Sequence, residues 1–358
     1  MTNTYNIAVL AGDGIGPEVI EQALKVVKAI GQRFECQFIF TPALVGAAAI
    51  DRTGNPYPDE THDICMQSDA VLFGAIGDPK YDNDPKAKIR PEDGLLAMRK
   101  KLGLYANIRP VTTFKSLVHK SPLKTELIEG VDFVVIRELT GGIYFGEPRG
   151  RSENGLTAFD TCTYTRAEVE RIGRLAFEYA RRRAKRLTAV DKANILATSR
   201  LWRETMQALH ADYPDVELEF MFVDNAAMQL VTLPRKFDVV VTENMFGDIL
   251  TDEASVITGS LGLLPSASIG VHTSVFEPIH GSYPQAAGKN IANPLGTILS
   301  AALMFEYALN MPEAGQLIRH ACEKSIEESV VTVDIAVDKP YTTSEVGDWI
   351  AEKLKSKS

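Results

Sequence analysis

The chain has 358 residues, of which 45% are hydrophobic and 24% are charged, and its formal net charge at pH 7 is −9. Such a length and composition predict a globular protein of about two domains. The acidic balance argues against general nucleic-acid binding, and no apolar run approaches the roughly 18 residues that a membrane span needs.

The cysteines and the N-terminal residues indicate a cellular compartment. The cysteines are widely scattered and have no C-x-x-C spacing, which argues against a zinc site or thioredoxin-type chemistry; they are Cys36, Cys65, Cys162 and Cys322. The first six residues are polar and lack the pattern of a signal or transit peptide. We therefore expect a reducing, cytoplasmic location.

Short apolar runs alternate with helical patterns in the first part of the chain. Residues 7–10 predict a strand, and a helix follows from Pro17, whose ring suits the first helical turn. Residues 70–74 predict a second buried strand, and 94–102 a further helix. The Gly12-Asp-Gly-Ile-Gly16 segment fails the G-x-G-x-x-G fingerprint because its last glycine would fall on Pro17. This excludes an ordinary Rossmann phosphate site, although the glycines still permit close backbone approach.

The same alternation continues to the C-terminus. Strands are predicted at 132–136, 187–190, 218–223 and 238–242, and helices from Arg166, Ser199 and Ala226 and over 295–309, 312–329 and 344–355. Thr165 and Glu168 have the spacing of a capping box. The basic run at 181–186 closes a helix, where cations complement the helix dipole. Together these elements predict an α/β fold with parallel or mixed sheets.

Asp248 and Asp252 lie four residues apart in a stretch with helical periodicity. This spacing places both carboxylates on one helix face, where hard oxygen ligands suit Mg²⁺ or Mn²⁺. The alternative is a solvated acidic helix face. The apolar residues around the pair favour a buried helix, on which two carboxylates require a positive partner.

Three arginines from separate segments, Arg99, Arg109 and Arg137, are candidates to bind substrate carboxylates, since guanidinium groups hold carboxylates bidentately. Each alone could equally form a structural ion pair. Tyr144, beside a glycine-rich turn that we interpret as a hairpin, is a candidate proton donor or a packing residue. Lys192 and Asp224 each follow a strand-like run, where open α/β sheets present ligands. Lys192 is a candidate for acid–base work, with a surface lysine as the alternative.

Assembled in order, these segments closely resemble the β-decarboxylating dehydrogenases, the isocitrate and isopropylmalate dehydrogenases. The resemblance covers nearly the whole chain. Its most specific motifs are Asn244-Met-Phe-Gly-Asp-Ile-Leu-Thr-Asp-Glu253, followed by Gly259-Ser-Leu-Gly-Leu-Leu-Pro-Ser-Ala267, and Glu277-Pro-Ile-His-Gly-Ser-Tyr-Pro284.

The resemblance implies a two-domain α/β subunit without a Rossmann fold, working as a homodimer. Residues 1–104 plus 259–358 would form the first domain, on the cofactor side. Residues 105–258 would form the second, which carries the substrate and metal side and the dimer contact. Asp248 and Asp252 match metal ligands that a third carboxylate, matching Asp224, completes from the other subunit.

The family pattern also assigns the chemistry. Arg99, Arg109 and Arg137 match the clamp on the substrate carboxylates, and Asp224 also faces the substrate. Lys192, assisted by Asp224, would take the proton of the substrate hydroxyl, a nicotinamide would accept the hydride, and Tyr144 would act as the acid. A non-catalytic regulatory member of the superfamily would lack one of these groups, and none is missing here.

Several residues match the cofactor side of the family: Ile15, Glu92, Glu277, His280, Gly281, Ser282, Gln285 and Asn293. Gln285 departs from the pattern, because NAD-using relatives commonly place an aspartate there for the ribose hydroxyls. Glutamine can hydrogen-bond a hydroxyl but lacks the charge that repels a 2′-phosphate. With no cation at 285 or 286 to favour that phosphate, we predict NAD with weaker discrimination against NADP.

Leu95 and Leu96 bear on the substrate, because the matching pair contacts the isopropyl group in relatives that oxidise 3-isopropylmalate for leucine biosynthesis. Burying three aliphatic carbons is worth about 2 kcal/mol. Placing the additional carboxylate of isocitrate against two leucines would cost several kcal/mol. The pair therefore favours isopropylmalate over isocitrate, homoisocitrate or tartrate.

Overall fold

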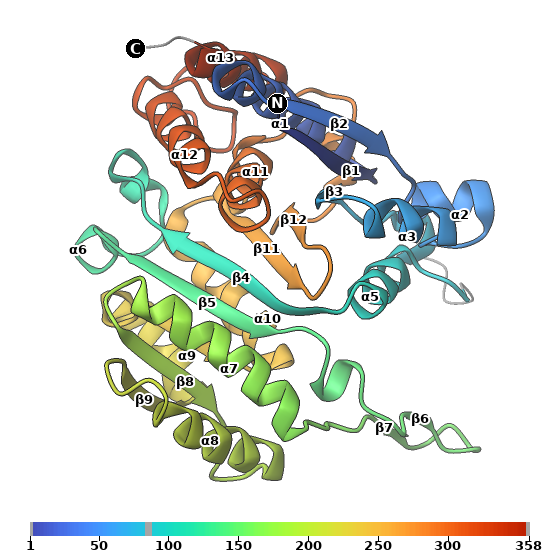
Figure 1. Cartoon of the computed structure of the whole chain (residues 1–358), viewed down its shortest axis with the longest axis vertical. Coiled ribbons are helices and arrows are strands. Elements are labelled where there is room, and N and C mark those ends of the chain that lie inside the picture. The colour runs from blue at the N-terminus through green and yellow to red at the C-terminus, as the bar shows by residue number, and fades with distance from the viewer. Residues whose placement is uncertain (1–2, 83–87, 356–358) are drawn as a thin grey trace. The chain divides into compact units, whose positions relative to one another are not determined.

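The structure is a computed structural model that describes residues 3–82 and 88–355 (Figure 1). The chain divides into two compact units. Met1–Leu104 and Gly259–Ser358 form the first unit, and Tyr105–Thr258 form the second. Each unit contains strands and helices, and the predicted α/β fold class is confirmed.

The strands of the first unit follow the order β2-β1-β3-β12-β11. Their bounds are Thr4–Gly12 for β1, Gln37–Pro42 for β2, Ala70–Ala75 for β3, Pro265–Gly270 for β11 and Val275–Pro278 for β12. The β1–β2, β1–β3 and β3–β12 pairs are parallel, and the β11–β12 pair is antiparallel. This sheet is therefore mixed. β3 is buried along its whole length, as its unbroken apolar composition predicts.

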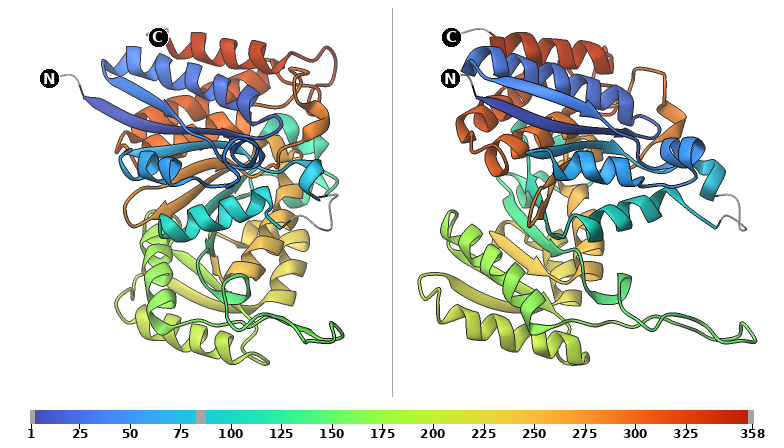
Figure 2. Two further views of the ribbon diagram at one scale, coloured as in Figure 1. Left: turned by 90° about the vertical axis from the view of Figure 1, so that its right-hand side faces the viewer. Right: turned by 45° about the vertical axis from the view of Figure 1, so that its right-hand side comes forward.

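Helices pack on this sheet through their apolar residues. Their bounds are Gly16–Phe34 for α1, Ala47–Thr53 for α2, Asp59–Met66 for α3, Pro79–Asp82 for α4, Pro91–Lys101 for α5, Leu295–Tyr307 for α11, Pro312–Glu327 for α12 and Thr343–Lys355 for α13. α1 has Pro17 in its first turn, as predicted. α11 is buried on every side from Leu295 to Phe305, so it forms the centre of the unit. Figure 2 shows α1 and α13 lying side by side.

The second unit has the strand order β4-β5-β10-β8-β9. Their bounds are Leu104–Thr112 for β4, Asp132–Glu138 for β5, Arg186–Asp191 for β8, Glu217–Phe222 for β9 and Val239–Thr242 for β10. The β4–β5 pair is antiparallel, and the β5–β10, β10–β8 and β8–β9 pairs are parallel. The carboxyl ends of β5, β8 and β10 therefore meet at one edge of the sheet. Arg137, Asp191 and Glu243 lie at or just after these ends.

The helices of the second unit are α6 (Thr125–Ile128), α7 (Arg166–Arg181), α8 (Ala197–His210), α9 (Val223–Thr232) and α10 (Asn244–Ser255). The capping box that opens α7 is confirmed, since Thr165 Oγ1 accepts from Glu168 N at 3.3 Å and Glu168 Oε2 accepts from Thr165 N at 2.7 Å. A short ribbon of β6 (Gly150–Arg151) and β7 (Ala158–Phe159) extends away from the body of this unit (Figure 2).

Several predicted elements differ from the structure. β2, β4, β11 and β12 were not predicted, because their apolar runs are short and are interrupted by polar residues or Pro. α5 and α9 begin three residues earlier than predicted. Asp224 thus lies in the first turn of α9, one residue further from the strand end than expected. The glycine turn before Tyr144 is a 3₁₀ turn, Gly142–Tyr144, and not a hairpin. None of the helices in the described residues is long and apolar enough to cross a membrane.

Candidate active site

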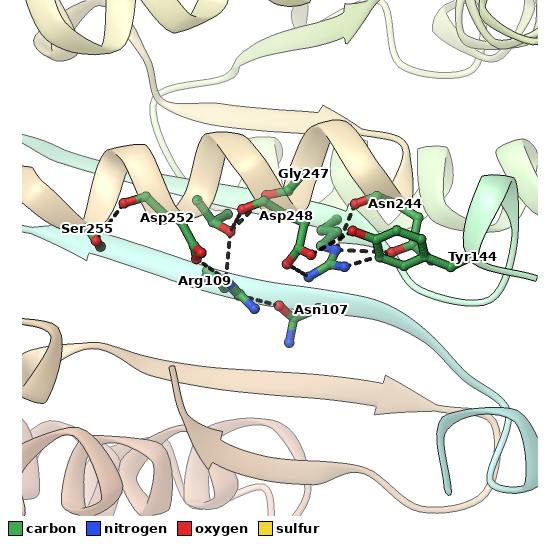
Figure 3. Close-up of polar contacts among 10 residues, drawn as sticks. Asn107, Arg109, Tyr144, Asn244, Gly247, Asp248, Asp252 and Ser255 are labelled. Atoms are coloured by element: carbon green, nitrogen blue, oxygen red, sulfur yellow. Dashed lines mark hydrogen bonds and ion pairs between the residues drawn. The ribbon is translucent and has the colours of Figure 1, made fainter. Parts of the chain in front are cut away.

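The two aspartates of the acidic stretch lie on one face of α10, so the predicted helix is confirmed (Figure 3). Asp248 and Asp252 both project toward the strands that carry Arg137 and Arg109. The Asp248 side chain is 37% exposed and that of Asp252 is 72% exposed. Each carboxylate faces an arginine, so the acidic helix face is ion-paired as well as solvated.

Arg137 is 1% exposed and lies under the first turn of α10. Its Nε donates to Asn244 O at 2.8 Å, its Nη2 donates to Asn244 Oδ1 at 2.8 Å, and its Nη1 bonds to Asp248 Oδ1. An added Cβ on Gly247 would lie 2.5 Å from Cγ of Arg137. Gly247 is therefore required for α10 to pack this closely on the arginine.

Arg109 occupies the equivalent place one turn further along α10. It donates from Nε to Asn107 Oδ1 at 2.7 Å and from Nη1 to Thr251 Oγ1 at 2.6 Å. Its Nη1 also lies 3.5 Å from Asp252 Oδ1. Both arginines are thus fixed by neutral partners as well as by an aspartate, which holds each guanidinium in one orientation.

Tyr144 joins the same cluster from the 3₁₀ turn after β5. Its hydroxyl donates to Asp248 Oδ2 at 2.8 Å, and the Arg137 guanidinium carbon lies 5.8 Å from its ring centroid. The hydroxyl therefore points into the site, which argues against the packing-only alternative.

A buried carboxylate fixes the turn that precedes Tyr144. Glu138 accepts from the backbone N and the hydroxyl of Thr140, both at 2.8 Å, and from Gly141 N at 2.8 Å. Burial raises the pKa of Glu138. Burial also raises the pKa of Glu243, the residue before α10, to about 7. Two buried acids, Glu138 and Glu243, thus lie next to site residues in the chain, and the sequence patterns did not identify either of them.

Lys192 and Asp224 form a separate pair within the second unit. Lys192 Nζ lies 3.0 Å from Asp224 Oδ2, and the hydrogen bond from Lys192 lowers the pKa of Asp224. Among the described residues, no three His, Cys, Asp or Glu side chains are grouped closely enough to hold a metal ion. Within one chain, Asp224 therefore does not join Asp248 and Asp252.

The first unit contains the remaining predicted substrate residues, on α5. Leu95 and Leu96 are half-buried, and Arg99 is buried, with a buried Nε that has no hydrogen-bond partner. Glu92 is exposed in the first turn of the same helix. A buried donor without a partner is costly, so the Arg99 guanidinium is suited to donate a hydrogen bond to a ligand.

A cavity of about 500 Å³ in the first unit brings together four of the predicted cofactor residues, Ile15, His280, Gly281 and Asn293. His280 Nδ1 lies 3.0 Å from the carbonyl oxygen of Gly281, which can only accept, so Nδ1 carries the proton. Nε2 is then an acceptor, and it is buried without a partner. Burial lowers the pKa of His280, which keeps the ring neutral.

The other predicted cofactor residues lie outside the lining of this cavity. Ser282 is buried, and its carbonyl oxygen accepts from Ile15 N at 2.8 Å. Gln285 is exposed on the 3₁₀ turn Pro284–Ala286, and Glu277 lies on β12.

The glycine-rich turn after β1 is explained by backbone contact. Gly14 has a φ of +56°, and an added Cβ would lie 2.0 Å from the carbonyl oxygen of Ser282. Between the glycines, the buried Asp13 carboxylate accepts from Ala47 N at 2.9 Å, Ala48 N at 3.0 Å and Gly77 N at 2.9 Å. Asp13 therefore links the turn after β1 to the start of α2 and to the loop after β3, a role that only its tertiary contacts reveal.

Residues 6–350 match the sequence profile of the isocitrate/isopropylmalate dehydrogenase family. The chain is 58% identical over 353 residues to 3-isopropylmalate dehydrogenase of Bacteroides fragilis, covering 98% of this chain and 99% of that protein. It is 54% identical over 355 residues to 3-isopropylmalate dehydrogenase of Aquifex aeolicus, covering 98% and 97%.

A solved structure gives the same assignment. Isocitrate dehydrogenase from Methylococcus capsulatus is 36% identical with a TM-score of 0.88, and the match covers 98% of this chain and 100% of that one. Fold and sequence agree, and the chain belongs to the isocitrate/isopropylmalate dehydrogenase family of oxidoreductases.

Proposed function

We propose that the chain catalyses oxidative decarboxylation of 3-isopropylmalate to 4-methyl-2-oxopentanoate in leucine biosynthesis, with NAD and Mg²⁺ or Mn²⁺. The observation that carries this proposal is the bonded cluster of Arg137, Tyr144 and Asp248, in a chain 58% identical to a 3-isopropylmalate dehydrogenase. The cluster provides a cation for a substrate carboxylate, a proton donor and a metal ligand within one hydrogen-bonded group.

The charges of the cluster fit a divalent metal and a dicarboxylate. Arg109 and Arg137 now offset Asp252 and Asp248. A divalent cation on the aspartates and two substrate carboxylates on the arginines would leave this balance unchanged. The oxygen donors suit Mg²⁺ or Mn²⁺. Such a metal would act as a Lewis acid on the substrate oxygens, while bound NAD would accept the hydride.

The chain's own residues would perform the proton transfers. Arg109 and Arg137 would hold the malate carboxylates, and Lys192, paired with Asp224, would take the proton of the C2 hydroxyl. After the carboxylate on C3 leaves, Tyr144 would donate its proton to C3. Its hydrogen bond to Asp248 supports this role, because it aims the hydroxyl at the metal ligand.

The cavity of the first unit fits the adenosine end of NAD. Its volume of about 500 Å³ falls in the range of small-molecule sites. His280 Nε2 could accept a hydrogen bond from the adenine amino group, and apolar residues such as Ile15 line the walls. Gln285 would meet the ribose hydroxyls, which supports NAD with weak exclusion of NADP.

We propose a homodimer because α9, α10 and the 3₁₀ turn Val256–Thr258 that follows α10 expose apolar side chains close in sequence to the aspartates. Met228 and Val231 are 59% and 39% exposed, and they follow Asp224 by four and seven residues on α9. Ile249 and Val256 are 59% and 44% exposed beside Asp248 and Asp252. A second copy covering this apolar surface would bring its Asp224 toward Asp248 and Asp252.

The decisive experiment measures NADH formation from 3-isopropylmalate with Mg²⁺ or Mn²⁺. Parallel assays replace 3-isopropylmalate with isocitrate, or NAD with NADP. We expect 3-isopropylmalate to give the highest kcat/KM, since Leu95 and Leu96 suit an isopropyl group. Isocitrate turnover of equal efficiency would contradict the substrate, and a preference for NADP would contradict the cofactor. The Gln285→Asp variant provides the matched control, and it should increase the preference for NAD.

A further inference from the structure

The turn that carries Lys192 is bound to one face of α8. Lys192 N donates to Ser199 Oγ at 3.0 Å, and Ser199 is 4% exposed. Four residues further along α8, Arg203 donates from Nε to Asp191 Oδ2 at 2.8 Å and from Nη2 to Asp191 Oδ1 at 2.8 Å. Ser199 and Arg203 thus lie on one helix face and hold consecutive residues of the turn.

Asp191 connects Arg203 to the residues around Lys192. It is 1% exposed, and its Oδ1 also accepts from Ala193 N at 2.9 Å. The carboxylate therefore bonds to the guanidinium on one side and to the backbone just after Lys192 on the other. The turn then closes through hydrogen bonds from Ile195 N and Leu196 N to the Lys192 carbonyl oxygen, at 3.0 and 2.9 Å.

Aromatic rings fix the guanidinium itself. The Arg203 guanidinium carbon lies 5.0 Å from the ring centroid of Phe220 and 5.2 Å from that of Phe222. Lys192 Nζ lies 5.8 Å from the same Phe222 ring. Two fixed bonds and two ring contacts leave Arg203 little freedom, so the turn that it holds is rigid.

We propose that Arg203 is a positioning residue that acts through Asp191 to hold Lys192 where it serves the reaction. This inference rests on the proposed function of Lys192 and on the shared active site. Because Lys192 would act in the partner's site, Arg203 exerts its effect on the chemistry of the other subunit. Among the described residues, no hydrogen bond, ion pair or ring contact joins Arg203 to the cluster around Asp248.

The first test compares Arg203→Met with Arg181→Met. Arg181 is a matched control, because it bonds to Asp215 from Nε at 3.0 Å and Nη2 at 2.7 Å and stacks on Tyr213 at 4.4 Å. The two arginine side chains are also similarly exposed, 34% for Arg181 and 32% for Arg203. We expect Arg203→Met to lower kcat by about 10-fold to 100-fold with KM for the substrate little changed. Arg181→Met should leave kcat intact.

Arg203→Lys separates position from charge, since lysine retains the charge and can make only one of the two bonds to Asp191. We expect its kcat to lie between those of Arg203→Met and the wild type. A wild-type kcat in Arg203→Met, or a fall that Arg181→Met reproduces, would overturn the proposal.

The second test uses hybrid dimers, purified through two different tags so that only folded dimers are assayed. One chain carries Asp248→Asn and the other Arg203→Met. If Arg203 serves the partner's site, both defects fall in one site and the other is intact, so about half of the wild-type activity returns. If Arg203 serves its own chain's site, no activity above that of the parent homodimers returns, and the proposal fails.

A control hybrid of Asp248→Asn with Lys192→Ala distinguishes this failure from failure of the proposed function. Recovery in the control without recovery for Arg203→Met refutes the role of Arg203 alone. No recovery in either hybrid refutes the shared site itself.

Discussion

At the scale of single residues, the site depends on side chains held by more than one partner. Asp248 bonds to both Arg137 and Tyr144, and Arg137 also bonds to the backbone and side-chain oxygens of Asn244. Such a group is oriented before any ligand arrives, which lowers the cost of binding. Activity should therefore be sensitive to small changes in any side chain of this group.

Tyr144→Phe removes one hydroxyl and leaves the ring in place. If this hydroxyl is the proton donor, we expect kcat to fall by about 100-fold or more, with KM changing little. Steady-state kinetics with 3-isopropylmalate measures both. Tyr213→Phe is the control, since it loses a hydroxyl contact with Arg174 far along the chain from the site. Equal losses in the two variants would refute the role of Tyr144.

Glu243 gives a prediction for the pH dependence of stability. Its pKa is about 7 in the folded chain, against a value of 4.5 without burial. Between these values the folded chain holds a proton that the unfolded chain has released, so the free energy of unfolding falls as pH rises. Above pH 7 the fall in the free energy of unfolding is complete and amounts to about 3 kcal/mol.

Glu243→Gln removes this titration. We expect the variant to be more stable than the wild type at pH 8, and the difference to shrink as the pH approaches 5. Urea unfolding at several pH values measures it. Parallel stability profiles for the two proteins would show that Glu243 does not titrate in this range.

At the scale of elements, the packing of α10 against β5 sets the position of Arg137. The helix approaches so closely that only glycine fits at position 247. A glycine inside a helix costs about 1 kcal/mol against alanine, so its presence at a buried position indicates this close approach.

Gly247→Ala should therefore move Arg137 in spite of its better helix propensity. We expect kcat/KM for 3-isopropylmalate to fall by about 10-fold, mainly through KM, and the overpacked contact to cost about 1–3 kcal/mol. Kinetics and urea unfolding measure the two effects. A variant with unchanged KM and higher stability would show that Arg137 tolerates the extra methyl group.

At the scale of the whole molecule, the proposed dimer makes activity depend on assembly. Met228→Lys with Ile249→Lys places two charges in the apolar surface of α9 and α10, so we expect a folded monomer. Because Asp224 and Lys192 would then be missing from each site, the monomer should bind metal weakly and lack activity. Sedimentation and the NADH assay test this.

Ile39→Lys is the control for this pair of substitutions, since Ile39 is 51% exposed in the first unit. It should remain a fully active dimer. A stable monomer of the double variant with wild-type activity would rule out the shared site.

The sequence by itself determined the α/β class, the helix that carries Asp248 and Asp252, and the capping box at Thr165, because these depend on local periodicity and short-range hydrogen bonds. Its motifs also determined the family. The strands β2, β4, β11 and β12 escaped prediction, since their burial depends on neighbouring strands that lie far away in sequence.

Only the tertiary structure decided the partners of the candidate residues. The structural roles of Asn244, Gly247, Asp13 and Arg203 arise from tertiary contacts, the longest of which joins Gly247 to Arg137, 110 positions away. The bond of Tyr144 to Asp248 and the pairing of Lys192 with Asp224 are of the same kind. Long-range contacts depend on how strands and helices pack, and periodicity along the chain does not specify that packing.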